Sequence, residues 1–236
     1  MYKQKPSPNK RARQDSQKFE RRNLILEEAR HLFLKGSYES ISMAALSKKS
    51  GLAKGTLYLY FKSKEELFLA LYETHLEKWF GEVNAELEKM IHKKPADLNV
   101  IHLVVKLMVR SMKAHQDLAR LLIILHTILE QNIKISRAIE FKLKLAKHLT
   151  RTGSLLETAL KFPSSGEGAM LLLRANALII GLWQMANPGP VVREALEHPE
   201  IRGMKFDFFE EFSQTYSALL SGLELNKTNA KRSYQS

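Results

Sequence analysis

The sequence predicts an all-α fold of about nine helices, with a small N-terminal three-helix head ahead of a larger helical body. Apolar residues recur at helical spacing along most of the 236 residues, and no useful stretch alternates with a period of two, so no sheet is expected. Positive charge is concentrated at one end: residues 1–64 hold 15 lysines and arginines against 5 acidic residues, within a formal net charge of +12 for the chain. A concentrated positive field suits a polyanion such as DNA or an acidic membrane.

The N-terminal residues predict an arm followed by a helix. Residues 1–17 contain two prolines and five lysines or arginines with almost no apolar side chain, which is typical of a disordered basic arm. From Phe19 the pattern becomes helical, and Gly36 ends this first helix. The buried face of the helix is formed by Ile25, Ala29, Leu32 and Phe33.

Two short helices and a tight turn follow. Ser42 is placed to cap the second helix, which Gly51 ends, and a very short third helix is expected from about residue 53 to 59. A capping box opens the fourth helix, which we expect to reach about Met90. This capping box is formed by Ser63 and Glu66.

The rest of the chain is helical by the same spacing rule. The fifth helix ends near His115, the sixth is capped by Asp117, and the seventh covers about residues 134–161 with Gly153 as a possible kink. The eighth opens with a second capping box and stops before a Pro-Gly segment, and the ninth covers about residues 206–223. The second box is Ser164 with Glu167, and the Pro-Gly segment is Asn187-Pro188-Gly189-Pro190.

Composition narrows the compartment. The chain has no cysteine, which excludes disulfides and thiolate metal sites. The most apolar stretch, from Leu171 to Trp183, is interrupted by two polar residues and is shorter than the roughly 20 residues that a membrane span needs. The basic N-terminus lacks the apolar run of a signal peptide, so we expect a cytoplasmic protein, with no membrane partner.

The segment from Ile41 to Leu67 has a helix-turn-helix layout, because a helix, a tight turn, a short helix and a capped helix follow one another. In residue types and spacing it resembles the signature of the TetR family of bacterial transcriptional regulators, over about residues 20–70. The matching residues are Gly51-Leu52, Lys54-Gly55-Thr56-Leu57-Tyr58, Tyr60-Phe61 and Lys62-Ser63-Lys64-Glu65-Glu66-Leu67. The sequence departs from the family pattern at Leu46-Ser47, at Ser50 and at Ala44-Ala45.

The resemblance implies four segments and a function. The function is that of a sequence-specific DNA-binding regulator, not an enzyme, and most simply a repressor that a small-molecule effector releases from operator DNA. The segments are a disordered basic arm over 1–17, a helix-turn-helix DNA-binding domain over 18–66, a ligand-binding and dimerisation domain over 67–225, and a flexible tail over 226–236.

Helical geometry predicts which face of the short third helix meets DNA. At 100° per residue Leu57 lies opposite Gly55 and Leu59, so an inward Leu57 turns the other two outward. Gly55 removes side-chain bulk where an α-helix would enter the major groove. The expected contacts are base edges or thymine methyls for Lys54, Thr56 and Leu59, and phosphates for Ser42, Tyr58 and Tyr60.

Lys64 is expected to hold a phosphate. It lies in the first turn of a helix, where a cation opposes the helix dipole by roughly 0.3–1 kcal/mol. The placement is explained if Lys64 and the free helix N–H groups bind one phosphate together. An ordinary solvated lysine is the alternative.

The body is expected to pair two chains and to hold an effector. A homodimer would place two heads about 34–36 Å apart on DNA, and the resemblance assigns pairing to the last two long helices, about 165–186 and 206–223. The dimerisation residues expected there are Ala175, Ala177, Gly181, Phe209, Phe212, Tyr216 and Leu219, with packing inside one chain as the alternative. The resemblance also implies an apolar or aromatic effector, lined by Leu107, Met108, Met112, Leu125, His126, Leu129, Phe141, Trp183 and Gln184.

Two rival readings stay open. A constitutive or architectural DNA-binding factor would share the head but have a filled body. A small helical enzyme or carrier would use the basic head only to bind acidic surfaces. The eight histidines are scattered without a metal-binding or catalytic motif, so no metal or other cofactor is expected.

Overall fold

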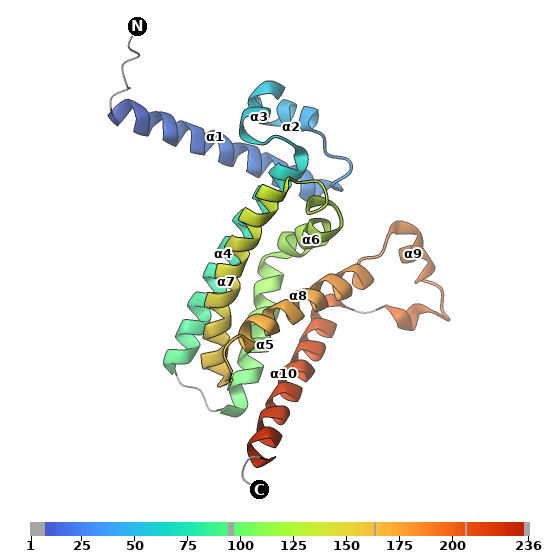
Figure 1. Cartoon of the computed structure of the whole chain (residues 1–236). Helices are drawn as coiled ribbons and strands as arrows, with labels where there is room; N and C mark the ends of the chain where they lie inside the picture. The colour runs from blue at the N-terminus through green and yellow to red at the C-terminus, as the bar shows by residue number, and fades with distance from the viewer. Residues whose placement is uncertain (1–7, 94–96, 163, 206, 234–236) are drawn as a thin grey trace. The chain divides into compact units, whose positions relative to one another are not determined.

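The computed structural model describes residues 8–93, 97–162, 164–205 and 207–233. Within these ranges every regular element is a helix, which confirms the predicted all-α fold (Figure 1). The α-helices are α1 (Pro8–Lys35), α2 (Met43–Ser50), α3 (Lys54–Tyr60), α4 (Lys64–Lys93), α5 (Asp97–Ala114), α6 (Gln116–Ile124), α7 (Ile135–Leu160), α8 (Glu167–Ala186), α9 (Pro190–Ala195) and α10 (Phe208–Ser233). A π turn, η1 (Leu125–Leu129), continues α6, and a short 3-10 turn, η2 (Arg202–Met204), precedes α10.

The chain divides into two compact units. The first unit comprises residues 1–74 and 124–133, and the second comprises residues 75–123 and 134–236. Helix α4 begins in the first unit and continues in the second. Helix α9, which the sequence did not predict, accounts for the difference from about nine helices, because Pro190 opens a short helix directly after the Pro-Gly break.

The two chain ends are more helical than expected. Helix α1 begins at Pro8, so the disordered arm predicted over 1–17 is wrong for residues 8–17, and residues 1–7 lie outside the described residues. Proline favours the first position of a helix, and the alanine, arginine and glutamine that follow are good helix formers. The tail predicted as flexible over 226–236 is likewise helical as far as Ser233, as a continuation of α10.

The core of the first unit is built from α1, α2, α3 and the first turns of α4. Phe68 of α4 lies at its centre, with the ring centroids of Phe33 and Tyr38 5.6 and 5.0 Å away, both edge to face. Ile25 and Leu46 are fully buried beside them. These residues fix α2 and α3 on α1, as the apolar stripe of α1 predicts.

In the second unit α4 and α7 run side by side (Figure 1). They are joined by a buried hydrogen bond of 2.7 Å from the Thr152 hydroxyl to the Asn84 amide oxygen, and by His148 stacked on Phe80 at 4.8 Å. Helix α5 is tied to α4 by the Trp79 indole N–H, which donates to the Ser111 hydroxyl at 3.1 Å. Buried polar groups with partners of this kind specify one register of helix packing.

Helices α7 and α8 meet at two glycines. A Cβ on Gly168 would lie 2.1 Å from the Gly153 carbonyl oxygen, and a Cβ on Gly153 would lie 2.6 Å from the Ala169 nitrogen. Gly153 lies inside the continuous helix α7, where it permits this close approach instead of a kink. Only glycine leaves room for two backbones at this separation.

The capping box predicted at the start of α8 is wrong. Helix α8 begins at Glu167 after Gly166, whose φ is +94°, and Ser164 does not cap it. Glu157 of α7 takes that role, because its Oε1 accepts hydrogen bonds from the backbone N–H groups of Gly166 and Gly168 at 2.7 and 3.0 Å. A carboxylate at this position satisfies free N–H groups and complements the helix dipole.

Helix α8 spans twenty residues and is, among the described residues, the one helix long and apolar enough to fit a membrane span by length and composition. It is longer than the stretch expected from the sequence. One of its faces, however, is buried in the second unit with α7 and α10 as neighbours. The buried residues on that face are Gly168, Leu171, Leu172, Ala175 and Ile179, as in a core helix.

Candidate DNA-binding site

The turn between α2 and α3 is held by three local contacts. The Ser42 hydroxyl caps α2 by accepting from the Ala45 backbone N–H at 3.1 Å, as predicted. Gly51 ends α2 with φ of +68°, a conformation that favours glycine. The Ser47 hydroxyl donates to the Leu52 carbonyl at 2.6 Å, so this departure from the family pattern adds a hydrogen bond across the turn.

Helix α3 has the orientation that its sequence predicts. Leu57 is fully buried, whereas Leu59 is 82% exposed and Gly55 faces open space with no atom within 4 Å of a built Cβ. Lys54 and Tyr58 are also exposed on this helix. The outer side of α3 therefore presents one long apolar side chain, one cation and one hydroxyl around a position without bulk.

The remaining residues expected to contact DNA lie around this face. Ser42 is exposed at the start of α2, and Thr56 and Tyr60 are half-buried on the two sides of α3. Arg22 of α1 places its guanidinium 5.3 Å from the ring centroid of Phe61, the residue that follows α3. This cation–π contact connects α1 to the end of α3, and the sequence gave no sign of it.

Lys64 has partners within the protein. Its ammonium donates to the carbonyl oxygens of Tyr38 and Ile41 at 2.8 and 2.9 Å, and lies 3.7 Å from the centroid of the Tyr38 ring. Burial lowers the pKa of Lys64, and the charges of Glu65 and Glu39 partly offset this effect. These contacts correct the reason inferred from the sequence, because two carbonyls explain the position of the cation at the start of α4 without a phosphate.

Replacing Lys64 by methionine is expected to destabilise the protein in the absence of DNA. Methionine keeps most of the aliphatic stem but leaves two partly buried carbonyls without a donor, at about 1–3 kcal/mol. Thermal unfolding followed by circular dichroism measures the change. The control is Lys62→Met, because Lys62 is an exposed lysine two residues away. Equal melting temperatures with a loss of DNA affinity confined to Lys64→Met would restore the phosphate role.

The residues expected to pair two chains divide into two groups. Ala175, Phe212 and Tyr216 are buried inside a single chain, at 1% exposure or less, so the expectation that they contact a partner is wrong. Phe212 stacks on Tyr216 at 5.4 Å within the core. The others have surface to offer: Ala177 and Gly181 are exposed, and Phe209 and Leu219 are half-buried.

The residues expected to line an effector site are divided between the two units. Leu125, His126 and Leu129 belong to the first unit, and the other six belong to the second. His126 and Gln184 are exposed, and the half-buried Trp183 meets Phe208 edge to face at 4.9 Å. Six are buried in the cores of their own units, namely Leu107, Met108, Met112, Leu125, Leu129 and Phe141.

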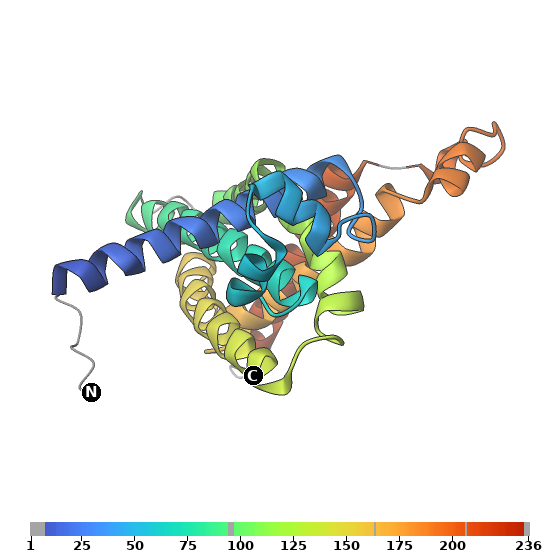
Figure 2. The same ribbon diagram turned by 90° about the horizontal axis from the view of Figure 1, so that it is seen from above.

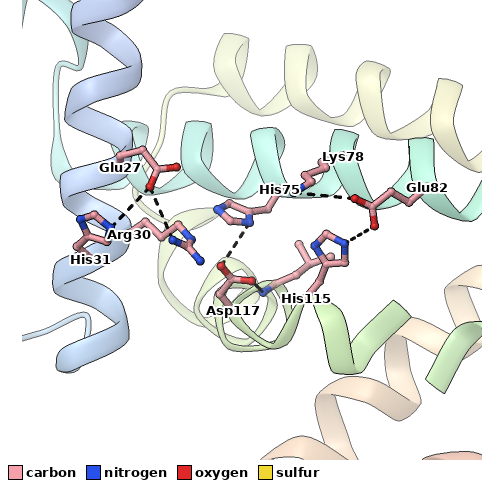
Figure 3. A network of polar contacts seen from close by, with 9 residues as sticks. Glu27, Arg30, His31, His75, Lys78, Glu82, His115 and Asp117 are labelled. Carbon is pink, nitrogen blue, oxygen red and sulfur yellow. Dashed lines mark hydrogen bonds and ion pairs between the residues drawn. The ribbon is translucent and has the colours of Figure 1, made fainter. Parts of the chain in front are cut away.

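Two histidines of the second unit pair with carboxylates (Figure 3). His115 Nε2 lies 2.7 Å from Glu82 Oε2, and His75 Nδ1 lies 3.5 Å from Asp117 Oδ2. The hydrogen bond with His115 holds the pKa of Glu82 below its ordinary value. Across the described ranges, histidines and acidic residues form no group of three or more that could hold a metal ion.

The fold and the exposed face of α3 define a helix-turn-helix DNA-binding protein. Comparison with known families agrees along most of the chain: residues 25–71 match the bacterial regulatory proteins of the tetR family, and residues 73–227 match the tetracyclin repressor-like C-terminal domain. The chain belongs to the TetR family and is a DNA-binding transcriptional regulator.

Similarity to curated proteins is confined to a short stretch. The chain is 35% identical over 69 residues to the HTH-type transcriptional regulator YhgD of Bacillus subtilis, which covers 29% of this chain and 36% of that protein. It is 40% identical over 55 residues to the regulator QacR of Staphylococcus aureus, covering 23% and 29% of the two chains. With the repressor KstR of Rhodococcus jostii it shares 39% over 59 residues, covering 25% and 28%. The matches therefore span about a third of these relatives.

Solved structures extend the likeness to the whole fold. A TetR-family regulator from Mesorhizobium loti superposes with a TM-score of 0.53 at 14% identity, covering 86% of this chain and 95% of that one. The fatty acid degradation regulator FadR of Bacillus halodurans gives 0.50 at 16% identity, covering 84% and 96%. At these identities the comparison concerns the fold alone.

Proposed function

We propose that the protein is a repressor that binds a palindromic operator as a homodimer and is released by a small apolar or aromatic effector. The orientation of α3 is the observation that carries the DNA-binding part. Its buried Leu57 fixes the helix, and its exposed Gly55 and Leu59 form a face narrow enough for a major groove about 12 Å wide. The relative KstR is named a repressor, which favours repression over activation.

Selection of bound duplexes from a random pool tests this proposal. The expected result is a two-fold symmetric consensus whose half-sites lie about one helical turn, or a multiple of it, apart. Leu59→Ala should change the preferred base at one position in each half-site, because removal of this exposed side chain takes away an apolar contact with a thymine methyl. Binding that shows no base preference in the wild type would contradict sequence-specific regulation, and an unchanged consensus in Leu59→Ala would contradict the role of Leu59.

A surface stripe on α8 supports pairing of two chains. Met170, Leu173, Ala177, Gly181 and Met185 are all exposed on α8. Their spacing of three or four residues places them on one side of the helix, opposite its buried face. We call this set the α8 stripe. It is wide enough to pack against its own copy across a two-fold axis, and the small residues Ala177 and Gly181 permit close approach of two helices.

The effector part has a definite rival. Six of the nine residues expected to line an effector site are buried in the protein cores, which favours a constitutive DNA-binding factor with a filled body. Thermal unfolding across a panel of apolar and aromatic compounds separates the two proposals. A compound that raises the melting temperature and weakens operator binding supports release by an effector. A panel without such a compound supports the constitutive factor.

A further inference from the structure

The segment between α8 and α10, which we call the α9 arm (residues 187–205), is ordered but has almost no core of its own. Pro188 and Leu196 are partly buried, and every other residue of the arm is exposed. Figures 1 and 2 both show α9 and the turns after it extending away from the rest of the second unit. The exposed apolar side chains include Val191 at 81%, Val192 at 53%, Ile201 at 37% and Met204 at 68%.

The arm takes its order from hydrogen bonds within itself. The backbone N–H of Arg193 donates to the Gly189 carbonyl at 2.9 Å, and its guanidinium donates to the Pro188 carbonyl at 3.1 Å. Lys205 pairs with Glu197 and so closes the far end of the arm on its middle. A segment that is internally fixed and displays aliphatic side chains to water has the properties of a preorganised docking surface.

Charge narrows the choice of partner. The arm contains three basic and three acidic residues, so it carries no net formal charge. DNA and anionic membranes both require a positive surface, which the arm does not provide. Its mixture of aliphatic side chains and balanced charge suits a protein surface of the same kind. The charged residues are Arg193, Glu194, Glu197, Glu200, Arg202 and Lys205.

The arm is continuous with the α8 stripe. Met185, the last member of the stripe, is 64% exposed and lies two residues before the arm begins. A surface that covers Met185 therefore also faces the first turn of the arm, where Val191 is exposed. In a two-fold dimer the same patch occurs on both chains, so the arm of each chain lies beside the other chain.

We infer that the α9 arm of each protomer packs against the partner protomer and extends the contact made by the α8 stripe. This inference rests on the proposed homodimer. It assigns Val191 and Met204 to an interface between chains, although both are exposed in a single chain. The partner is a second copy of this chain.

Cross-linking at a single thiol tests the inference. Because the chain has no cysteine, Met204→Cys introduces the only thiol, which can carry a benzophenone. A tagged chain with the label is mixed with an untagged chain that lacks it, and the sample is then irradiated. The expected product joins the two chains. The control is Glu77→Cys, exposed on α4, which should give no such product. A Met204→Cys label that reacts only within its own chain, or with nothing, overturns the inference.

Sedimentation of a second variant separates this inference from the proposed homodimer. Val191→Asp places a charge on the exposed arm and is expected to weaken dimerisation at least tenfold, while Thr150→Asp, exposed on α7, leaves it unchanged. A wild-type chain that sediments as a monomer contradicts both proposals. A stable dimer that Val191→Asp does not weaken contradicts the inference alone.

Discussion

Gly168→Ala is expected to lower the free energy of unfolding by about 3 kcal/mol, at the upper end of the effects measured for overpacked cores. The added Cβ would lie 2.1 Å from the carbonyl oxygen of Gly153 and 2.7 Å from its carbonyl carbon. Both atoms belong to the backbone of α7, so no side chain can rotate away to make room. The two helices must separate, which also weakens the hydrogen bonds from the Gly166 and Gly168 N–H groups to Glu157.

Thermal unfolding by circular dichroism measures this effect, which corresponds to roughly 6–12 °C for a chain of this size. The matched control is Gly81→Ala. Gly81 lies inside α4, where a new Cβ meets no atom within 4 Å. This variant should gain about 0.5–1 kcal/mol, because alanine favours a helix more than glycine does. If the two variants changed stability in the same direction, α7 and α8 would not be in close contact at Gly168.

The sequence predicted most of the local structure because local rules determine it. Ser42 and Gly51 mark the ends of α2 through capping and positive φ, and the alternation of buried and exposed residues on α3 follows from its period alone. The capping hydrogen bond from the Glu66 backbone N–H to the Ser63 hydroxyl, at 3.2 Å, is equally local. Such features involve residues three or four positions apart, so the pattern is visible in the sequence.

Contacts between distant segments were not predictable in this way. Lys64 donates to carbonyls 23 and 26 residues earlier in the chain, and no spacing rule connects these positions. Glu157 likewise replaces the expected cap of α8 from another helix, nine residues before Gly166. The apolar stripe of α10 showed which residues avoid water, but it did not show whether Phe212 and Tyr216 were covered by their own chain or by a partner.

Gly55→Leu is expected to reduce operator affinity at least 100-fold, which corresponds to about 2.7 kcal/mol, while the fold stays intact. Gly55 is exposed on α3, and a side chain there would meet no protein atom within 4 Å of its Cβ. Leucine also favours a helix more than glycine does, so the free protein should be at least as stable as the wild type. The bulk therefore acts only on the partner that approaches this face.

Fluorescence anisotropy with the selected operator, at one fixed salt concentration, measures the affinity. Gly81→Leu adds the same side chain to an exposed helical glycine of α4 and should leave DNA binding unchanged. The comparison isolates the position of the added bulk from its size. Because the exposed side of α3 has its least bulk at Gly55, a base-pair edge that enters there must come close to the helix backbone, and a leucine side chain would prevent that approach. Gly55→Leu protein that binds the operator as well as Gly81→Leu would mean that DNA meets another surface of the protein.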